Sequence, residues 1–228
     1  MTTLTQKDIE ILEAIDSPTV ANVIETYNLR LRNEGYTDGT IKNRLPKLQS
    51  MVGYAFTMQM RTTKPPVKGL YYPDRSDWWD ILAALPKPRI LVIQNTDDNP
   101  MQGSVAGGVH GSIFKALGCI GIVTNGAVRD LPSLDAMHLY VYSGSVVPSH
   151  AYSHIIDVGV PINIGGLEIK NGDLLHGDVH GIVNIPHNIA HEIPDAAIKV
   201  MKHEREIQQF CNSDSFSIEK LRRMIQKF

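Results

Sequence analysis

An arginine and an aspartate stand side by side in the segment TNGAVRDLPSLD, residues 124–135. Arg129 offers a planar fork of N–H donors that suits a carboxylate, and Asp130 offers a hard oxygen that suits Mg²⁺ or Mn²⁺. Side by side on one turn, the two residues could hold an anionic ligand and a cation close together. This combination suits a 2-oxo acid, whose carboxylate would bind the arginine while its keto oxygen faces the metal.

The element that must position this pair is the apolar run CIGIV, residues 119–123, which has the character of a buried strand in a parallel sheet. Residues just past the carboxyl end of such a strand lie where open α/β sheets usually bind ligands. We therefore expect a turn after this strand, with Gly126 allowing the tight bend that presents Arg129 and Asp130. The alternative is a solvated pair in which Asp130 caps the turn formed by LPSL.

Apolar spacing predicts two helices near the N-terminus, and the second has Ser17 as its N-cap and Pro18 at its first helical position. Further helices and strands alternate along the middle of the chain, which predicts a mixed, layered α/β fold. The predicted helices cover residues 5–15, 17–29, a short stretch within 76–88, 109–118 and most of 187–228, with a break at 211–217. The predicted strands cover residues 50–60, 89–95 and 119–123, with others within 138–145, 155–169 and 180–186.

Composition places the chain among ordinary globular proteins. Its 228 residues are 43% apolar and 20% charged, enough for one full core, and they predict a single domain over residues 1–228. The core is expected at about 15–190 and the C-terminal helices at about 187–228. The formal net charge of −2 gives no sign of a nucleic-acid or membrane surface, and no apolar stretch approaches transmembrane length. Two cysteines are too few for a disulfide scaffold, so a cytoplasmic location is expected.

Residues 106–134, AGGVHGSIFKALGCIGIVTNGAVRDLPSL, resemble the defining segment of a known family. This family contains the regulator of ribonuclease activity A (RraA) and the 4-hydroxy-4-methyl-2-oxoglutarate aldolases. The positions that match the family pattern are Gly107, Gly118, Gly121, Gly126, Arg129 and Asp130. Residues 169–186, IKNGDLLHGDVHGIVNIP, resemble its closing segment, and residues 17–27 and 51–58 resemble its opening helix and first strand. The resemblance covers most of residues 15–210.

This resemblance implies a swivelling β/β/α sandwich that assembles as a homotrimer or homohexamer, with sites between subunits. It implies a metal-dependent (class II) aldolase or an enzyme like oxaloacetate decarboxylase, which cleaves or decarboxylates a 2-oxo acid and releases pyruvate. Asp130 would hold Mg²⁺ or Mn²⁺, and Arg129 would hold the pyruvyl carboxylate. The helix start at Gly107, Gly108, Val109 and His110 would bind substrate oxygens, with the backbone amides of Val109 and His110 as donors.

The sequence departs from the family pattern at acidic positions. Gly108 stands where many of the aldolases carry an acidic residue that reaches the metal through water, and Asn125 and Asn22 replace frequent aspartates. These changes favour an alternative function, that of a non-catalytic, protein-binding homologue of the ribonuclease E activity regulator. Asp130 favours the enzyme, because the regulator itself lacks this aspartate.

An acidic residue from the C-terminal helix, Glu204 or Glu206, would match the family residue that reaches a neighbouring subunit's metal through water. A solvated helix face explains the two glutamates equally well. A Schiff-base aldolase would instead require a desolvated lysine, and the candidates Lys115 and Lys170 have no distinguishing context.

Histidines also recur at short spacings: His150 and His154 lie four residues apart, and His176 and His180 flank Asp178. A histidine metal site would need a helix to bring such pairs onto one face, and Pro148 and the β-like residues make a helix doubtful here. Structural or surface histidines are therefore expected, and substrate contact by His150 or His154 stays open.

Overall fold

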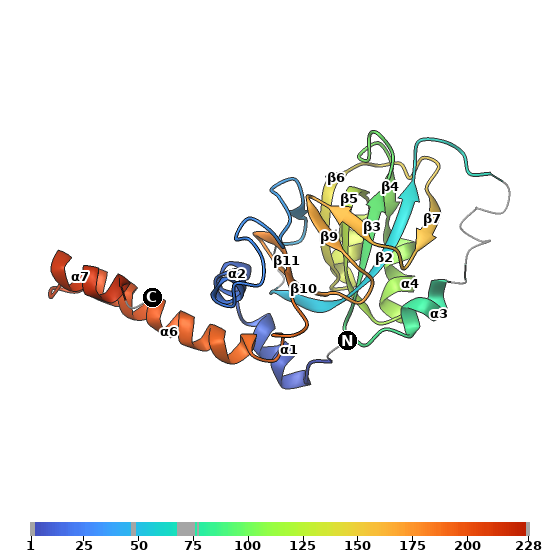
Figure 1. Cartoon of the computed structure of the whole chain (residues 1–228). Helices are drawn as coiled ribbons and strands as arrows, with labels where there is room; N and C mark the ends of the chain where they lie inside the picture. Colours follow the sequence, from blue (N-terminus) through green and yellow to red (C-terminus); the bar gives the residue numbers. More distant parts are fainter. Residues whose placement is uncertain (1–2, 47–48, 68–75, 77, 227–228) are drawn as a thin grey trace.

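The protein, described by a computed structural model over residues 3–46, 49–67, 76 and 78–226, is built on a central parallel sheet. Its four middle strands lie in the order β6 (Tyr140–Val146), β5 (Cys119–Val128), β3 (Arg89–Asn95) and β2 (Met51–Arg61). Figure 1 shows these strands at the centre of the molecule. Because the carboxyl ends of parallel strands share one edge of the sheet, residues that follow β5 and β6 come together there.

Antiparallel strands extend the sheet on both sides. β10 (Leu174–Asp178) pairs with the first half of β2 and turns back as β11 (Gly181–Ile185), while β7 (His154–Val158) pairs with the second half of β2. On the other side, β1 (Lys42–Asn43) borders β6 in antiparallel orientation. The short β4 (Ser104–Ala106) instead pairs in parallel with the end of β5, outside the main strand order. β8 (Ile162–Ile164) and β9 (Leu167–Ile169) form a separate hairpin.

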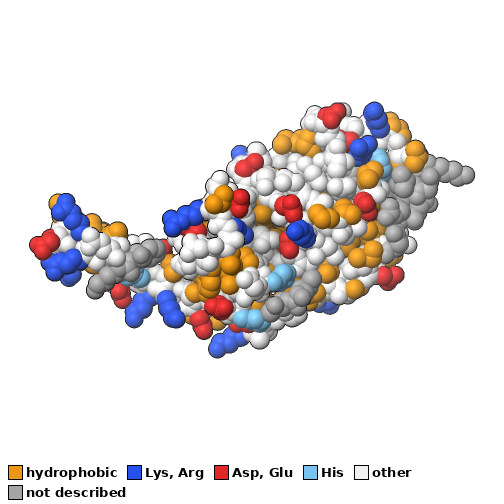
Figure 2. All heavy atoms as spheres, viewed as in Figure 1, with side chains coloured by type: hydrophobic (Ala, Val, Ile, Leu, Met, Phe, Trp, Pro, Cys, Tyr) orange, Lys and Arg blue, Asp and Glu red, His pale blue; other side chains and the backbone are white. Residues whose placement is uncertain are grey.

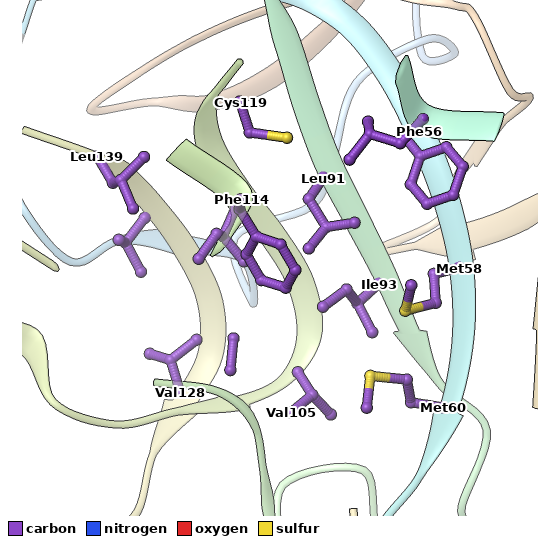
Figure 3. Close-up of a cluster of buried hydrophobic side chains, with 14 of the residues drawn as sticks. Phe56, Met58, Met60, Leu91, Ile93, Val105, Phe114, Cys119, Val128 and Leu139 are labelled. Atoms are coloured by element: carbon purple, nitrogen blue, oxygen red, sulfur yellow. The ribbon is translucent and has the colours of Figure 1, made fainter. Parts of the chain in front are cut away.

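The two faces of the sheet are buried by different layers. Alternate residues of β2, such as Phe56 and Met58, pack with Leu91, Ile93 and the helices on one face (Figure 3). These helices are α3 (Trp78–Ala83), α4 (Gly108–Ala116) and α5 (Leu131–Ala136). On the opposite face, the intervening residues pack against the β8–β9 hairpin and the β10–β11 hairpin. The result is a mixed α/β fold in which helices cover one face of the sheet, while the β8–β9 hairpin and the β10–β11 end of the sheet itself cover the other; this confirms the predicted fold class.

The terminal helices form a third cluster. α1 (Gln6–Glu13), α2 (Ser17–Thr26) and the start of α6 (Ile193–Cys211) pack together against β10 and β11. The rest of α6 and α7 (Ile218–Ile225) extend from the body as an arm (Figure 1). Lysine and arginine side chains gather at the end of this arm, where α7 carries Lys220, Arg222 and Arg223 (Figure 2).

Most predicted elements are present, but two local predictions are wrong. The N-cap of α2 is Asp16, whose carboxylate accepts from the Thr19 amide at 2.8 Å, and Ser17 is instead the first helical residue. The turn expected after residue 123 does not form, because β5 continues to Val128 and Gly126 lies within it. A register irregularity between Thr124 and Ala127 replaces the turn. Arg129 and Asp130 therefore follow the true end of β5.

The two cysteines have opposite environments. Cys119 begins β5 and is buried against the helical layer, and this burial raises the pKa of its thiol to about 12, although the nearby Arg89 opposes the rise. Cys211 is exposed at the end of α6. Within the described part of the chain, no helix is both long enough and apolar enough to cross a lipid bilayer.

Candidate functional site

A pocket of about 290 Å³ opens at the carboxyl ends of β4 and β5, where the starts of α4 and α5 meet the loop after β6. The predicted residues converge on it from three separate segments of chain. Its lining consists of Ser104, Ala106, Gly107, Gly108, Val109, His110, Arg129, Asp130, His150 and Ser153. The structure thus brings together every residue of this chain that the sequence assigned to catalysis or substrate binding.

Asp130 owes its position to an unusual backbone conformation and to two helices. Its φ of 56° is left-handed, which aspartate tolerates better than most residues. Its carbonyl accepts from the Ser133 and Leu134 amides and so begins α5, but its side chain makes no cap bond to that helix. Instead, Oδ2 accepts from the Gly108 amide at 2.9 Å, at the positive end of α4. The carboxylate is thereby aimed into the pocket.

Arg129 is held beside Asp130 where the ends of β4 and β5 meet. Its amide donates to the Ala106 carbonyl at 3.0 Å, which ties the end of β5 to the end of β4. Its Nε lies 3.6 Å from Asp130 Oδ2, and Nη1 lies 3.5 Å from the Pro148 carbonyl. The Arg129 side chain remains 35% exposed, so its fork can still meet a ligand that enters the pocket. The expected arrangement, a carboxylate binder next to a hard oxygen, is geometrically present.

Gly107 allows the close approach between these two segments. A Cβ at this position would lie 2.7 Å from Asp130 Oδ2 and 3.0 Å from Arg129 Cγ. At the neighbouring Gly108, the nearest atom to an added Cβ would be Ser133 Cβ at 3.3 Å. The first glycine is therefore required by the packing of the pair, and the second is much less constrained.

The pocket could hold a divalent cation, but it offers the ion only one carboxylate. Mg²⁺ binds through one or two carboxylates and keeps several waters. Asp130 Oδ1 accepts no hydrogen bond from the described residues, and the carboxylate is 45% exposed, so it has room for such a partner. Among those same residues, no group of three or more His, Cys, Asp or Glu side chains could form a full protein cage. A metal here would rely on Asp130, water and the substrate.

Three side chains of the lining were given no definite chemical role by the sequence. His110 was expected to contribute its backbone amide, yet its imidazole lines the pocket. His150, for which substrate contact was left open, also lines it, whereas His154 lies buried outside it, with Nδ1 2.7 Å from the Tyr152 carbonyl. The Oγ of Ser153 is buried in the pocket wall without a hydrogen-bond partner in the described structure. The only sequence signal for His110 was a histidine in the first turn of a helix.

The other histidines have structural partners. His176 is fully buried; its Nδ1 lies 3.0 Å from Ser17 Oγ and its Nε2 lies 3.0 Å from the Leu12 carbonyl. Asp178 accepts from the Ser17 amide at 2.9 Å and pairs with His180. Burial raises the pKa of Asp178, but the hydrogen bonds from Ser17 and His180 outweigh it and hold the pKa below its usual value. These residues join α2 to β10.

The remaining candidates lie away from the pocket. Glu204 accepts from Asn22 Nδ2 at 3.4 Å, and neither Glu204 nor Glu206 lines the pocket of its own chain. The ammonium group of Lys115 donates to the Met137 carbonyl at 2.6 Å, and that of Lys170 lies 3.4 Å from a carboxylate oxygen of Glu168. Neither lysine lines the pocket as a Schiff-base aldolase would require.

Comparisons with known proteins agree with this architecture. A family model described as RraA-like (Aldolase/RraA) matches residues 20–184. An uncharacterised protein of Methanocaldococcus jannaschii is 25% identical over 59% of this chain and 66% of its own length. A candidate 4-hydroxy-4-methyl-2-oxoglutarate aldolase of Halalkalibacterium halodurans is 33% identical over 36% of this chain and 40% of its own length. This chain thus spans less than two thirds of either relative.

Among solved structures, RraAS2 of Streptomyces coelicolor has a similar fold. It is described as an unusual member of the RNase ES inhibitor RraA protein family. The two structures superpose with a TM-score of 0.71 and 22% identity, over 91% of this chain and 99% of the other. At this identity the similarity concerns the fold alone.

Proposed function

This chain belongs to the RraA-like (Aldolase/RraA) family, and we propose that it is a carbon–carbon lyase that releases pyruvate from a 2-oxo acid. The reaction is a retro-aldol cleavage like that of 4-hydroxy-4-methyl-2-oxoglutarate aldolase, or a decarboxylation like that of oxaloacetate. One observation carries the proposal: the guanidinium of Arg129 and the carboxylate of Asp130 share one pocket, with Nε and Oδ2 3.6 Å apart.

Different residues of the pocket bind different parts of the substrate. Arg129 grips the substrate carboxylate with two parallel N–H donors, which a lysine could not do. The Gly108 N–H already donates to Asp130, and the N–H groups of Val109 and His110 in the first turn of α4 favour an anionic oxygen because they lie at the positive end of the helix. Together they fix the 2-oxo acid with its keto oxygen toward Asp130.

Asp130 would hold Mg²⁺ or Mn²⁺ through its carboxylate, with water filling other positions. When bound, the ion would supply Lewis-acid stabilisation of the negative charge that develops on the keto oxygen as the carbon–carbon bond breaks. Glu204 or Glu206 from a neighbouring subunit would add an acidic group through water. We further propose that the protein is cytoplasmic and assembles as a trimer or hexamer.

A second candidate function is protein binding without catalysis, as in the ribonuclease E activity regulator. The neutral Gly108 next to the metal position favours it, because this site has one acidic group fewer than many of the aldolases. The retained Asp130 carboxylate, aimed into the pocket, favours the enzyme.

A coupled assay separates these functions. The purified protein is incubated with Mg²⁺ or Mn²⁺ and a panel of 4-hydroxy-2-oxo acids and oxaloacetate, and pyruvate is detected with lactate dehydrogenase. We expect pyruvate release that a chelator abolishes and added metal restores. Activity that survives the chelator and is lost on borohydride treatment with substrate would indicate a Schiff base instead. Absence of pyruvate release across the whole panel would favour the binding protein.

A further inference from the structure

The helix α7, at the end of the arm, carries an apolar stripe made of Ile218, Leu221 and Ile225. These residues recur at i, i+3 and i+7, so they share one face of the helix. None of the described residues of α7 is buried, and Ile218 and Ile225 are 62% and 53% exposed. A helix of eight residues is too short to be stable alone in water, where about 12 residues or more are needed. We therefore expect the stripe to pack on another surface.

The contacts within the arm do not cover this stripe. Phe216 packs on Phe210, near the end of α6, with ring centroids 5.7 Å apart, and the ammonium group of Lys220 lies 4.6 Å from the centre of the Phe210 ring. Both contacts hold α7 to α6 through residues outside the stripe. The start of α6 packs against α2, and its 19 residues span roughly 28 Å. α7 therefore lies far from the α2 helix of its own chain (Figure 1).

A groove of about 180 Å³ between α2 and β11 has the apolar character that the stripe requires. Pro18 and Ala21 of α2 form one side of it, and Ile182 and Val183 of β11 form the other. Tyr36, which is 45% exposed, also lines the groove and forms an isolated β-bridge with Val183. The groove can therefore accept aliphatic side chains from a second surface.

The charges around the groove and on α7 have opposite signs. α7 carries three basic residues and one acidic residue, and the basic ones gather at the end of the arm (Figure 2). Residues 8–29 hold most of α1 and all of α2, and they include no lysine or arginine. Their acidic residues are Asp8, Glu10, Glu13, Asp16 and Glu25. Glu25 follows Ala21 by one turn on the face that lines the groove, and its partner Arg32 is 79% exposed. Such complementarity favours docking in one orientation.

We propose that α7 of one copy of this chain docks in the groove between α2 and β11 of a second copy. The apolar stripe fills the groove, and the basic side chains face the acidic residues of α2. This interaction goes beyond the proposed lyase reaction, because the groove shares no lining residue with the pocket of Arg129 and Asp130. A basic amphipathic helix also suits an anionic lipid surface, but here the stripe spans only two turns and the chain itself offers a matching groove.

Cross-linking between two differently tagged, co-expressed copies tests where α7 docks. Both copies carry Cys211→Ser, because Cys211 is exposed, whereas Cys119 is buried. One copy also carries Ala21→Cys in the groove, and the other carries Ile218→Cys in the stripe. A short bismaleimide should then give a product that contains both tags. In the control, Ala84→Cys, exposed just after α3, replaces Ala21→Cys and should give at least about tenfold less product.

Two further variants test the apolar and the charged parts of the docking separately. Ile225→Asp in the Ile218→Cys copy should lower the yield at least about tenfold, because it places a charge in the groove. Ile81→Asp, at an exposed isoleucine of α3, should leave the yield unchanged. Glu25→Lys in the groove copy leaves the arm intact, so it remains informative if Ile225→Asp unfolds α7. It should lower the yield, and less so at high salt.

The outcomes separate this docking from the proposed function. A product no more abundant than the Ala84→Cys control overturns the docking and leaves the lyase intact, as does a yield that neither Ile225→Asp nor Glu25→Lys lowers. Cross-linking confined to single chains that carry both cysteines would place α7 on its own chain and also overturn the docking. Binding of the parent to vesicles of anionic phospholipid, without any product between chains, would assign α7 to a membrane surface instead.

Discussion

The left-handed backbone of Asp130, with φ of 56°, makes asparagine a clean replacement because asparagine also tolerates this conformation. Asp130→Asn can still accept from the Gly108 amide, but it loses the negative charge that a hard cation requires. We expect an unchanged circular dichroism spectrum and a fall in metal-dependent kcat/KM of about a hundredfold or more. Asp135→Asn, on the same helix but outside the pocket, is the control. Equal turnover in both variants would reduce Asp130 to a structural link between α4 and α5.

A second single-residue change, Arg129→Lys, tests recognition of the substrate carboxylate. The ammonium keeps the charge but cannot form two parallel bonds, so the keto oxygen would be misplaced. A loss of roughly 2–4 kcal/mol in transition-state stabilisation is expected, measured as kcat/KM with the best substrate of the panel. Arg205→Lys on the exposed arm should match the parent. A lysine variant as active as the parent would show that the guanidinium fork has no special role.

The sequence singled out this pair because two adjacent side chains with distinct chemistry lie on a recognisable segment, and the structure places both in one pocket. It did not predict the His110 imidazole. The ring stacks on Phe114 of its own helix and lines the pocket together with Arg129 and His150, which come from elsewhere in the fold. Such a position depends on three-dimensional neighbours that a spacing pattern does not contain.

At the scale of elements, the junction of β4, α4 and β5 depends on one glycine. Gly107→Ala would place a methyl group 2.7 Å from Asp130 Oδ2, so the carboxylate or the start of α4 must shift. Gly108→Ala meets its nearest neighbour at 3.3 Å, which a small adjustment can relieve. We expect Gly107→Ala to lower kcat/KM at least about tenfold and Gly108→Ala to change it little. The reverse order of effects would contradict this account of the junction.

The same junction explains why one element was predicted wrongly. Asn125 and Gly126 form an Asn-Gly pair, which is ordinarily a turn signal. In the fold, Asn125 Oδ1 accepts from the Asn95 amide at 2.7 Å, and Nδ2 donates to the Asn95 carbonyl at 3.0 Å. The side chain thus continues the link between β3 and β5 past the Ile93–Thr124 pair, beside the register shift between β5 and β6, and the strand continues. An aspartate could not donate the second bond, which accounts for the amide at this position.

The link between α2 and β10 predicts how stability depends on pH. Burial lowers the pKa of His176, although the carbonyls of Leu12 and Ile15 and the charge of Asp178 oppose it. The unfolded chain therefore binds a proton below about pH 6.5 that the folded chain does not, so stability falls as pH decreases. Urea titrations from pH 7.5 to 5.5 should show this loss, at most about 1.4 kcal/mol per pH unit for one group. His176→Asn should reduce the slope; an unchanged slope would assign it to other groups.

At the scale of the whole molecule, the arm formed by α6 and α7 leaves large apolar side chains exposed. Ile198, Phe216, Ile218 and Ile225 are 47–62% exposed in the single chain. Together with the proposed acidic contribution of Glu204 or Glu206, this favours assembly with further copies. Light scattering should give three or six times the 25.3 kDa mass of the chain. A monomer with full activity would contradict a site shared between subunits.

Because one cysteine is exposed and the other is buried, the rates at which their thiols are labelled can report transient opening of the protein. A thiol-specific dye should label Cys211 within the native state, because that side chain is exposed at the end of α6. Cys119, buried at the start of β5 with a pKa raised to about 12, should react only when the central sheet separates from its helices. The rate of the slow second phase of labelling would then measure how often the central sheet separates from the helices that carry the pocket.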